Sequence, residues 1–274
     1  MRKEVFVLIL LVFLNILNFF SSEYAQFGTV ISLLQLASVS FDVFVGDVCR
    51  SLLNGGKMVL PSDNTKLNPK ELYSLMEKHQ VSLFEGTPGL ILPLLNYINE
   101  NGKDYSFLKL VIFGSDSFKN QTFNAIRDIF GGTVKTINSY GVTEATIDSS
   151  YFDDYKTDFT GTTPIGKPFS NTKIYILNEK EQLAPTGVFG TIYIGGSGVS
   201  RGYYNKSALT ASKFIKIPYQ NENAYSTGDL ARWLPEGNIE FLGRKDSQVK
   251  IRGYRIELEE IENNHSIIDS LKSE

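Results

Sequence analysis

The sequence is poor in the residues that build disulfides and metal sites. Its 274 residues include one cysteine, Cys49, and two histidines, His79 and His265. One cysteine cannot form an internal disulfide, which favours a reducing compartment, and we expect the protein to be cytoplasmic. The two histidines lie far apart in a chain without an HExxH or CxxC pattern, which argues against a zinc site.

The chain also lacks an excess of either charge. It has 27 Lys and Arg residues against 30 Asp and Glu residues, a formal net charge of −3. Proteins that bind nucleic acids usually carry a basic patch, so we expect no nucleic-acid partner. Apolar residues make up 42% of the sequence, an ordinary value for a globular protein of this length.

A long apolar run is found at the start of the chain. Residues 5–20 read VFVLILLVFLNILNFF, a run of 16 residues that includes Asn15 and Asn18. A helix needs roughly 20 apolar residues to cross a bilayer, and no A-x-A cleavage site of a secretory signal follows. We interpret residues 1–20 as an apolar leader, buried or signal-like, and favour a buried segment over membrane contact.

Short apolar runs then alternate with segments of helical spacing. The runs expected to form strands are 33–41, 57–60, 81–84, 108–113 and 133–137, and the expected helices are 43–54, 69–80, 87–102 and 118–132. This alternation predicts a mainly parallel sheet with helices on both faces. Ligands bind beyond the carboxyl ends of such strands. Polar residues or glycine stand at those ends: Asp42, Glu85, Gly114, Ser115, Asn138, Ser139 and Tyr140.

The second half of the chain has a β-rich pattern. Segments 190–196, 224–234 and 238–244 read as strands, with a Pro235-Glu236-Gly237 turn before the last of them. We expect antiparallel structure here, with a boundary near Gly243 to Asp246. Residues 247–262 read as a strand and a turn that lead into an acidic helix start.

One glycine-rich segment imitates a phosphate-binding loop. Residues 161–167, GTTPIGK, have the spacing of a P-loop as far as the lysine. The next residue is Pro168, which has neither a hydroxyl group for Mg²⁺ nor an N–H group for a helix start. We therefore reject a phosphate site in this segment.

Five segments occur in an order that resembles one enzyme family. They are FDVFVGD, NSYGVTE, GTIYIGGSGVSRGYY, YSTGDLARW and GRKDSQVKIRGYRIELEEIE. Together they resemble the amino-acid adenylation domains of nonribosomal peptide synthetases, within the adenylate-forming (AMP-binding) ligases, over residues 25–262. The resemblance implies an α/β adenylate-forming ligase fold. A partial large domain of mixed sheets and helices would span 21–245, and an incomplete C-terminal lid would span 246–274.

The resemblance also implies a reaction. Such enzymes join an amino-acid carboxylate to the α-phosphate of ATP, with Mg²⁺, and release pyrophosphate. They then pass the acyl group to the phosphopantetheine thiol of a peptidyl carrier protein. The implied partners are therefore an amino acid, a carrier protein and other synthetase modules, in the synthesis of a peptide antibiotic.

The resemblance assigns a set of residues to ATP (AMP). These residues are Asn138, Tyr140, Gly141, Thr143, Glu144, Asp229, Phe241 and Arg244. Asn138 and Tyr140 would flank the adenine. Asp229 would accept hydrogen bonds from both ribose hydroxyls, a role suited to a carboxylate with two acceptor oxygens, and Phe241 would pack near the nucleotide.

Three of these residues are the predicted catalytic residues. Thr143 would meet the α-phosphate, and Arg244 would reach the ribose and the phosphates. Glu144 would hold Mg²⁺, a cation that takes carboxylate and phosphate oxygens.

The resemblance also assigns an amino-acid pocket. Its residues are Asp42, Val43, Gly46, Glu85, Ile112, Gly114, Ser139, Ile147 and Asp148. Asp42 resembles the carboxylate that binds the substrate α-ammonium, although an aspartate there could also serve as a helix N-cap. Glu85 and Asp148 would be two further acids at the end of an apolar, glycine-lined slot. Acids in such a slot are unfavourable without a cation. The set resembles an ornithine pocket, with lysine as the near alternative.

Two parts of the family pattern are missing. The Ser/Thr/Gly/Lys-rich phosphate loop does not precede Asp42, and no lysine stands where the lid should carry one. We therefore expect little or no activity from the chain by itself, and an inactive fragment or remnant of a synthetase is an alternative. A further alternative is an acyl-CoA or aryl-acid ligase, which should lack an aspartate at position 42, because its substrate has no α-amino group.

Overall fold

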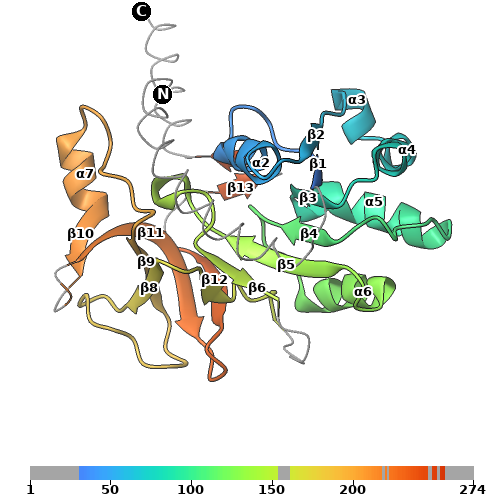
Figure 1. Cartoon of the computed structure of the whole chain (residues 1–274). Helices are drawn as coiled ribbons and strands as arrows, with labels where there is room; N and C mark the ends of the chain where they lie inside the picture. Colours follow the sequence, from blue (N-terminus) through green and yellow to red (C-terminus); the bar gives the residue numbers. More distant parts are fainter. Residues whose placement is uncertain are drawn as a thin grey trace, which may run out of the picture.

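The computed structural model describes residues 31–153, 161–217, 220 and 222–245, together with the backbone of 249–251 and 254–256 (Figure 1). The predicted apolar leader, residues 1–20, and most of the predicted lid, 246–274, lie outside these ranges. The division of the chain at residues 245 and 246 therefore stays a prediction. None of the helices in the described ranges is long and apolar enough to cross a membrane.

A seven-stranded sheet forms the first half of the described chain (Figure 1). Its strands are β1 (Ser32–Leu34), β2 (Lys57–Val59), β3 (Leu83–Gly86), β4 (Leu110–Phe113), β5 (Lys135–Tyr140), β6 (Ser150–Phe152) and β7 (Lys167–Pro168). Strands β1 to β5 pair in parallel, as predicted, and the structure gives their order as β2-β1-β3-β4-β5. Strands β6 and β7 extend the sheet in antiparallel orientation, an addition to the prediction. At three and two residues they are too short to show an alternating pattern.

Five helices connect or flank these strands. They are α2 (Asp42–Leu52), α3 (Asp63–Lys66), α4 (Pro69–His79), α5 (Pro88–Glu100) and α6 (Asn120–Phe130). Helix α4 begins as expected, because Pro69 is its first residue and the Asn68 side chain accepts hydrogen bonds from two amide groups of its first turn. Helix α6 ends at Gly131, whose φ of 53° favours glycine. Helix α3 is a single turn that carries no apolar repeat, so the sequence does not predict it.

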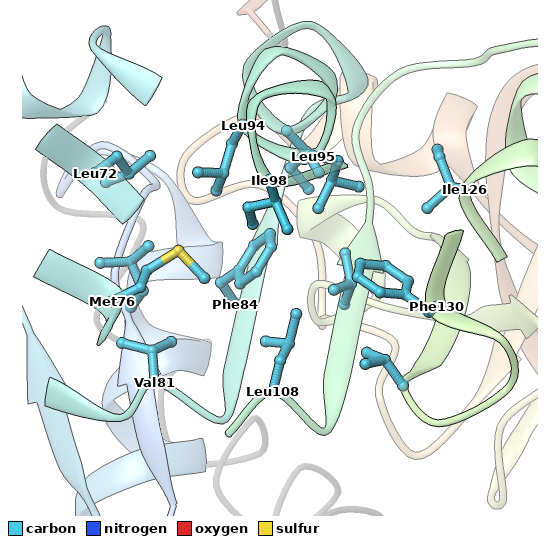
Figure 2. Packing of buried hydrophobic residues seen from close by; sticks show 14 of the residues in the cluster. Leu72, Met76, Val81, Phe84, Leu94, Leu95, Ile98, Leu108, Ile126 and Phe130 are labelled. Carbon is cyan, nitrogen blue, oxygen red and sulfur yellow. The ribbon is translucent and has the colours of Figure 1, made fainter. Parts of the chain in front are cut away.

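Helices cover both faces of this sheet, because side chains alternate along each strand. Leu34, Phe84 and Val111 belong to one core cluster with residues of α4, α5 and α6 (Figure 2). Leu33 and Leu83 point the other way and belong to a second cluster with Cys49 of α2. Burying one such side chain stabilises the fold by about 1.5–3 kcal/mol. Helix α2 thus lies against the face opposite to α4–α6, and the packing of Cys49 against Leu33 and Leu83 holds the helix on this face.

The second half forms an antiparallel sheet, as predicted. Its strands are β8 (Thr172–Leu177), β9 (Gly190–Gly196), β10 (Phe214–Ile217), β11 (Glu222–Trp233) and β12 (Ile239–Arg244), in the order β10-β11-β9-β8 with β12 beside β11. Helix α7 (Ser207–Lys213) precedes β10, and β13 (Val249–Ile251) pairs with β14 (Tyr254–Ile256). Ile174, Ile192 and Ile239 of this sheet form one cluster with Tyr140 of β5. The two sheets therefore share a core at the carboxyl end of β5.

The rejection of a P-loop at residues 161–167 is confirmed. Lys167 and Pro168 form strand β7 and do not open a helix. Gly166 has a φ of 75°, and a Cβ atom there would lie 1.7 Å from the carbonyl oxygen of Tyr151. The glycine is therefore required by a close approach of two backbone segments, which is a structural role.

Candidate active site

The strand ends bring the predicted pocket residues together. Glu85 lies near the end of β3, Gly114 directly follows β4, and Ser139 lies near the end of β5. A Cβ atom at Gly114 would lie 3.1 Å from both Glu85 Oε1 and Ser139 Oγ. A side chain at position 114 would therefore fill the space beside these two polar groups. Ile112 belongs to the cluster that lines the same face of the sheet.

Helix α2 closes the pocket from the other side. A Cβ atom at Gly46 would lie 3.1 Å from Ile147 Cδ1, so the helix backbone approaches the loop after β5 closely. Val43 packs against the cluster that contains Ile112 and Ile147. The structure thus brings together the predicted apolar and glycine positions of the slot.

A sharp loop returns Ile147 and Asp148 to the sheet. A Cβ atom at Gly141 would lie 1.7 Å from the carbonyl oxygen of Ile147, so only glycine fits there. Thr146 and Ile147 have φ values of 70° and 67°, a conformation that is unfavourable for β-branched residues. Backbone strain of this kind is concentrated at functional sites, where the surrounding structure enforces it.

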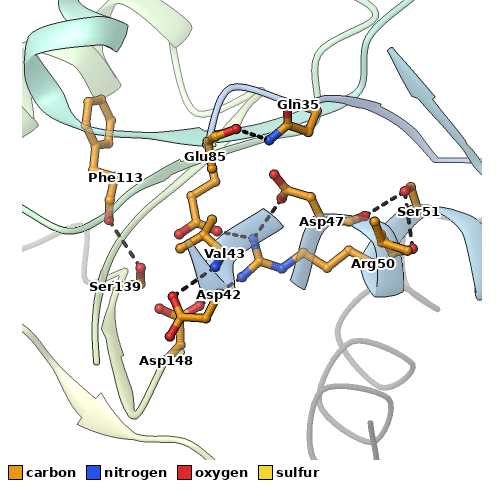
Figure 3. A network of polar contacts seen from close by, with 12 residues as sticks. Gln35, Asp42, Val43, Asp47, Arg50, Ser51, Glu85, Phe113, Ser139 and Asp148 are labelled. Atoms are coloured by element: carbon orange, nitrogen blue, oxygen red, sulfur yellow. Dashed lines mark hydrogen bonds and ion pairs between the residues drawn. The ribbon is translucent and has the colours of Figure 1, made fainter. Parts of the chain in front are cut away.

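The acids at the end of the slot have a partner that the sequence reading missed. Arg50 of α2 donates through Nη1 to Glu85 Oε2, and its Nη2 lies 2.9 Å from Asp148 Oδ2 (Figure 3). Nη1 also lies 3.5 Å from Asp47 Oδ1. The Arg50 side chain is 1% exposed. The expectation that Glu85 and Asp148 lack a cation within the chain is therefore wrong.

The acidic groups nevertheless outnumber this cation. Burial and the nearby Glu85 raise the pKa of Asp148 to about 7, although Arg50 acts in the opposite direction. Burial also raises the pKa of Asp47 well above its usual range, again against the effect of Arg50. One guanidinium faces three carboxyl groups, and burial favours the protonated forms of Asp47 and Asp148, an effect that a further cation would oppose.

Asp42 lies at the start of α2 with one oxygen unused. The N-cap residue of the helix is Phe41, and Asp42 is the first helical residue, so the N-cap reading of Asp42 is wrong by one position. Its Oδ1 accepts a hydrogen bond of 2.9 Å from the Val43 amide. Its Oδ2 is buried and makes no hydrogen bond of normal geometry within the described part of the chain, although the Thr143 hydroxyl lies close enough to lower the pKa of this carboxyl group. Burial raises the pKa of Asp42, and a bound ammonium group would reverse this effect.

The predicted ribose and adenine residues form a second cluster. The Tyr140 hydroxyl donates to Asp229 Oδ2 at 2.5 Å, and Arg244 Nη1 donates to Asp229 Oδ1 at 2.7 Å. Burial, followed by the charge of Asp229, raises the pKa of Tyr140 well above its usual value. The rings of Tyr140 and Phe241 are 6.4 Å apart between centroids. Asn138 donates to the Pro164 carbonyl oxygen at 2.8 Å, which orients its amide group.

The cluster is held by the pairing of β11 with β12. Asp229 and Arg244 are directly opposite each other in the register of these strands. The Thr227 hydroxyl accepts from the Asp229 amide at 3.0 Å, and Arg244 Nη2 donates to the Thr227 carbonyl oxygen at 3.1 Å. Asp229, which is 1% exposed, is therefore fixed in orientation by backbone and side-chain contacts on several sides.

Thr143 and Glu144 lie in a short 3-10 helix between the two clusters, Thr143–Ala145. Thr143 is exposed, whereas Glu144 is buried and accepts a hydrogen bond of 2.7 Å from the Tyr203 hydroxyl. Tyr203 is a residue that the sequence reading missed. No group of three or more His, Cys, Asp or Glu residues that could hold a metal occurs in the described ranges. Glu144 fits the kind of Mg²⁺ site in which substrate phosphates supply further ligands.

The helical spacing of Arg50 from two predicted pocket residues was visible in the sequence. Asp42, Gly46 and Arg50 are spaced at i, i+4 and i+8, so they lie on one face of a helix. Because Asp42 and Gly46 are pocket positions, the same face carries Arg50 into the pocket. Tyr203 has no comparable signal, since it reaches Glu144 across 59 residues.

Comparisons with known proteins identify the family to which the chain is similar. Residues 11–204 match the family model described as AMP-binding enzyme. The chain is 47% identical over 263 residues to gramicidin S synthase 2 of Brevibacillus brevis, which covers 95% of this chain and 6% of that protein. It is 50% identical over 243 residues to bacitracin synthase 2 of Bacillus licheniformis, over 88% of this chain and 9% of that protein.

A solved structure shares the fold. The Vibrio cholerae adenylation domain AlmE, in complex with glycyl-adenosine-5′-phosphate, superimposes with a TM-score of 0.74 at 27% identity. The match covers 90% of this chain and 47% of that one. The chain thus spans a small part of the synthases that it matches, and about half of the AlmE chain.

Proposed function

The chain belongs to the AMP-binding enzyme family, and from this membership we propose that it activates an amino acid as its adenylate for nonribosomal peptide synthesis. The observation that carries the proposal is Asp42. This residue presents a buried carboxylate oxygen without a hydrogen-bond partner in the described ranges, and a buried carboxylate requires a cation or donor. The α-ammonium group of an amino acid meets this requirement, whereas an aryl or fatty acid has no such group.

In the proposed reaction, a carboxylate oxygen of the amino acid attacks the α-phosphorus of ATP. A new P–O bond forms, the bond from the α-phosphorus to the bridging oxygen breaks, and pyrophosphate leaves with its electron pair. Asp42 would hold the ammonium end of the amino acid. Thr143, exposed beside the pocket, would contact the α-phosphate. Donors fixed at the point where charge develops lower the barrier of such a step.

The nucleotide would bind at the second cluster. Asp229 would accept hydrogen bonds from the ribose hydroxyls, with Arg244 holding its carboxylate and reaching the phosphates. Tyr140, Phe241 and Asn138 would flank the adenine, and Gly141 would let the loop pass close to it. Mg²⁺, bound by Glu144, would neutralise phosphate charge. The support for these roles is that the side chains meet at the carboxyl end of β5.

For the amino acid, we propose ornithine, with lysine as a weaker substrate. The support is the charge of the slot, where Asp47, Glu85 and Asp148 face the single guanidinium of Arg50. A terminal ammonium would raise the number of cations from one to two. Because Arg50 already pairs with Glu85 and Asp148, the expected preference for a cationic side chain is smaller than it would be for two unpaired acids. Glycine at positions 46 and 114 adds no side chain of its own to the slot, which Ile147, Glu85 and Ser139 approach closely.

We further propose that the phosphopantetheine thiol of a peptidyl carrier protein attacks the acyl carbon of the adenylate, so that a thioester forms, the acyl–phosphate bond breaks and AMP leaves. The support is the similarity to gramicidin S synthase 2 and bacitracin synthase 2, of which the chain spans 6% and 9%. The remaining modules of such an assembly would be the partners of this chain.

Calorimetric titration of the full chain tests the amino-acid site. Ornithine should bind more tightly than norvaline, which has a neutral side chain of similar length, and both should lose affinity in Asp42→Asn. The matched control is Asp128→Asn, the same change at an exposed position of α6. Equal affinities for the parent and Asp42→Asn, with both proteins folded, would contradict the proposal.

A further inference from the structure

Arg50 occupies the position between the two acids that we propose for the terminal ammonium of the substrate. Its Nη1 donates to Glu85, and its Nη2 lies 2.9 Å from Asp148 (Figure 3). A substrate cation that enters the slot would compete with this guanidinium for the same oxygens. A permanent Arg50 contact would therefore weaken the binding of the substrate that the acids would select.

Asp47 provides a second place for the guanidinium. It precedes Arg50 by three residues on α2, so the two side chains lie on the same side of the helix. Asp47 is 0% exposed, and the ion pair that it makes with Arg50 is long, at 3.5 Å from Oδ1 to Nη1. Its Oδ2 is buried and makes no hydrogen bond of normal geometry to any residue that the structure describes, although the Gln35 side chain lies close enough to lower the pKa of Asp47. This carboxylate could thus accept a closer guanidinium.

We propose that Arg50 is a movable counterion of the substrate pocket. It would pair with Glu85 and Asp148 in the absence of a cationic substrate, and withdraw to Asp47 when a substrate ammonium takes over these two acids. The proposal rests on the proposed function and adds two specificity-determining residues, Arg50 and Asp47. Arg50 acts by competing with the substrate, and Asp47 acts only through Arg50.

The exchange keeps every carboxylate close to a positive charge. Before it, Asp47, Glu85 and Asp148 share one cation, and after it the same three acids share two. A neutral side chain cannot drive the exchange, because it would leave Glu85 and Asp148 buried without a partner. The guanidinium would give up its contacts with Glu85 and Asp148 and shorten an existing contact to Asp47. Selection would therefore come from the displacement of Arg50 as well as from the new ion pair.

Titration of the full chain and its variants with ornithine and norvaline tests the exchange. Asp47→Asn removes the second position, so the affinity for ornithine should fall at least about tenfold, the equivalent of one charge-assisted hydrogen bond. Arg50→Gln removes the competitor, so ornithine should bind no more weakly than to the parent. In the Arg50→Gln background, adding Asp47→Asn should have no further effect. Asp128→Asn, at an exposed site on α6, is the matched control.

The opposite results would overturn the proposal. Weaker ornithine binding in folded Arg50→Gln would show that Arg50 holds the acids in place as a fixed partner. An equal loss from Asp47→Asn in both backgrounds would show that Asp47 acts without Arg50. Thermal unfolding of each variant separates these effects from loss of the fold.

A structure of the parent chain with ornithine gives a second test that needs no variant. Arg50 Nη2 should move beyond about 4 Å from Asp148, the limit of an ion pair, while Nη1 approaches Asp47 to hydrogen-bond distance. Bound ornithine with an intact Arg50–Asp148 pair would overturn the exchange and leave the proposed function standing. A parent chain that binds norvaline as tightly as ornithine would overturn the exchange and the proposed preference for ornithine, and would leave the proposed adenylation of an amino acid standing.

Discussion

At the scale of single residues, the pKa of Asp148 links the pocket to pH. It is raised from its ordinary value of 3.8 to about 7 by burial and by Glu85, against the effect of Arg50. Between these values the folded protein holds a proton that the unfolded chain has released. The free energy of unfolding should therefore fall as pH rises from about 4 to about 7.

Ornithine binding should show the reverse trend. An ammonium group pairs with the ionised form of Asp148, so the affinity should rise between pH 5.5 and about 7 and then level off. Asp148→Asn should flatten this profile, whereas Asp128→Asn at an exposed site should keep it. Calorimetric titrations over this range measure the effect. A profile that is unchanged in Asp148→Asn would show that another group is responsible.

The second residue prediction concerns Asp229. Each hydrogen bond from a ribose hydroxyl to its carboxylate is charge-assisted, and such a bond contributes about 1.5–3 kcal/mol. Asp229→Asn should therefore lower the affinity for ATP at least about tenfold in calorimetric titration. Because Asp229 also pairs with Arg244 and Tyr140, thermal unfolding must show that the variant is folded. Asp63→Asn, at an exposed position of α3, is the control.

Two results would count against this assignment. Equal ATP affinities in the parent and folded Asp229→Asn would remove Asp229 from the nucleotide site. No binding of ATP by either protein would favour the alternative that the chain is an inactive remnant of a synthetase.

At the scale of elements, the loop after β5 depends on one glycine. A Cβ atom at position 141 would lie 1.7 Å from the Ile147 carbonyl oxygen and 2.7 Å from Asp148 Cα. Gly141→Ala should therefore lower the free energy of unfolding by at least about 2 kcal/mol, as expected for a strained and overpacked site. It should also weaken ornithine binding, since Ile147 and Asp148 would shift.

Gly89→Ala is the matched control for this loop. Gly89 lies in helix α5, and a Cβ atom there would have no neighbour within 4 Å. Alanine favours a helix by up to about 1 kcal/mol over glycine, so this variant should be as stable as the parent or more stable. Denaturant unfolding compares the two. If Gly141→Ala were as stable as the parent, residues 147 and 148 could move away from the new Cβ atom without lowering the free energy of unfolding.

Local elements could be predicted from the sequence, whereas contacts between distant segments could not. Strands β1 to β5 and helices α2, α4, α5 and α6 could be predicted, because each has an apolar repeat or a cap that is local in sequence. The pocket positions were predicted from motif resemblance, and the structure brings these positions together. Arg50 was missed although its helical spacing from Asp42 and Gly46 was visible. The contact of Tyr203 with Glu144 depends on the tertiary packing of two sheets, for which no local pattern exists.

At the scale of the whole molecule, the pocket is assembled from a long stretch of chain. Asp42 to Arg50 come from α2, Glu85 from β3, and Asp148 from the loop that ends at β6. Arg50 reaches Asp148 across 98 residues. Individual pocket residues transferred to another protein would therefore lack the guanidinium that balances them. A transfer of the proposed pocket should therefore include the whole segment 42–148.

The last prediction uses this unit. Segment 42–148, grafted into a complete adenylation domain, should confer a preference for ornithine over norvaline of at least about tenfold in pyrophosphate exchange, the equivalent of one charge-assisted hydrogen bond. Some activation of lysine is expected, because one methylene group changes discrimination by only about 1–3 kcal/mol. Glu85→Gln together with Asp148→Asn should abolish the preference for a cationic side chain. A doubly neutral graft that still selects ornithine would show that the acids do not determine the choice of substrate.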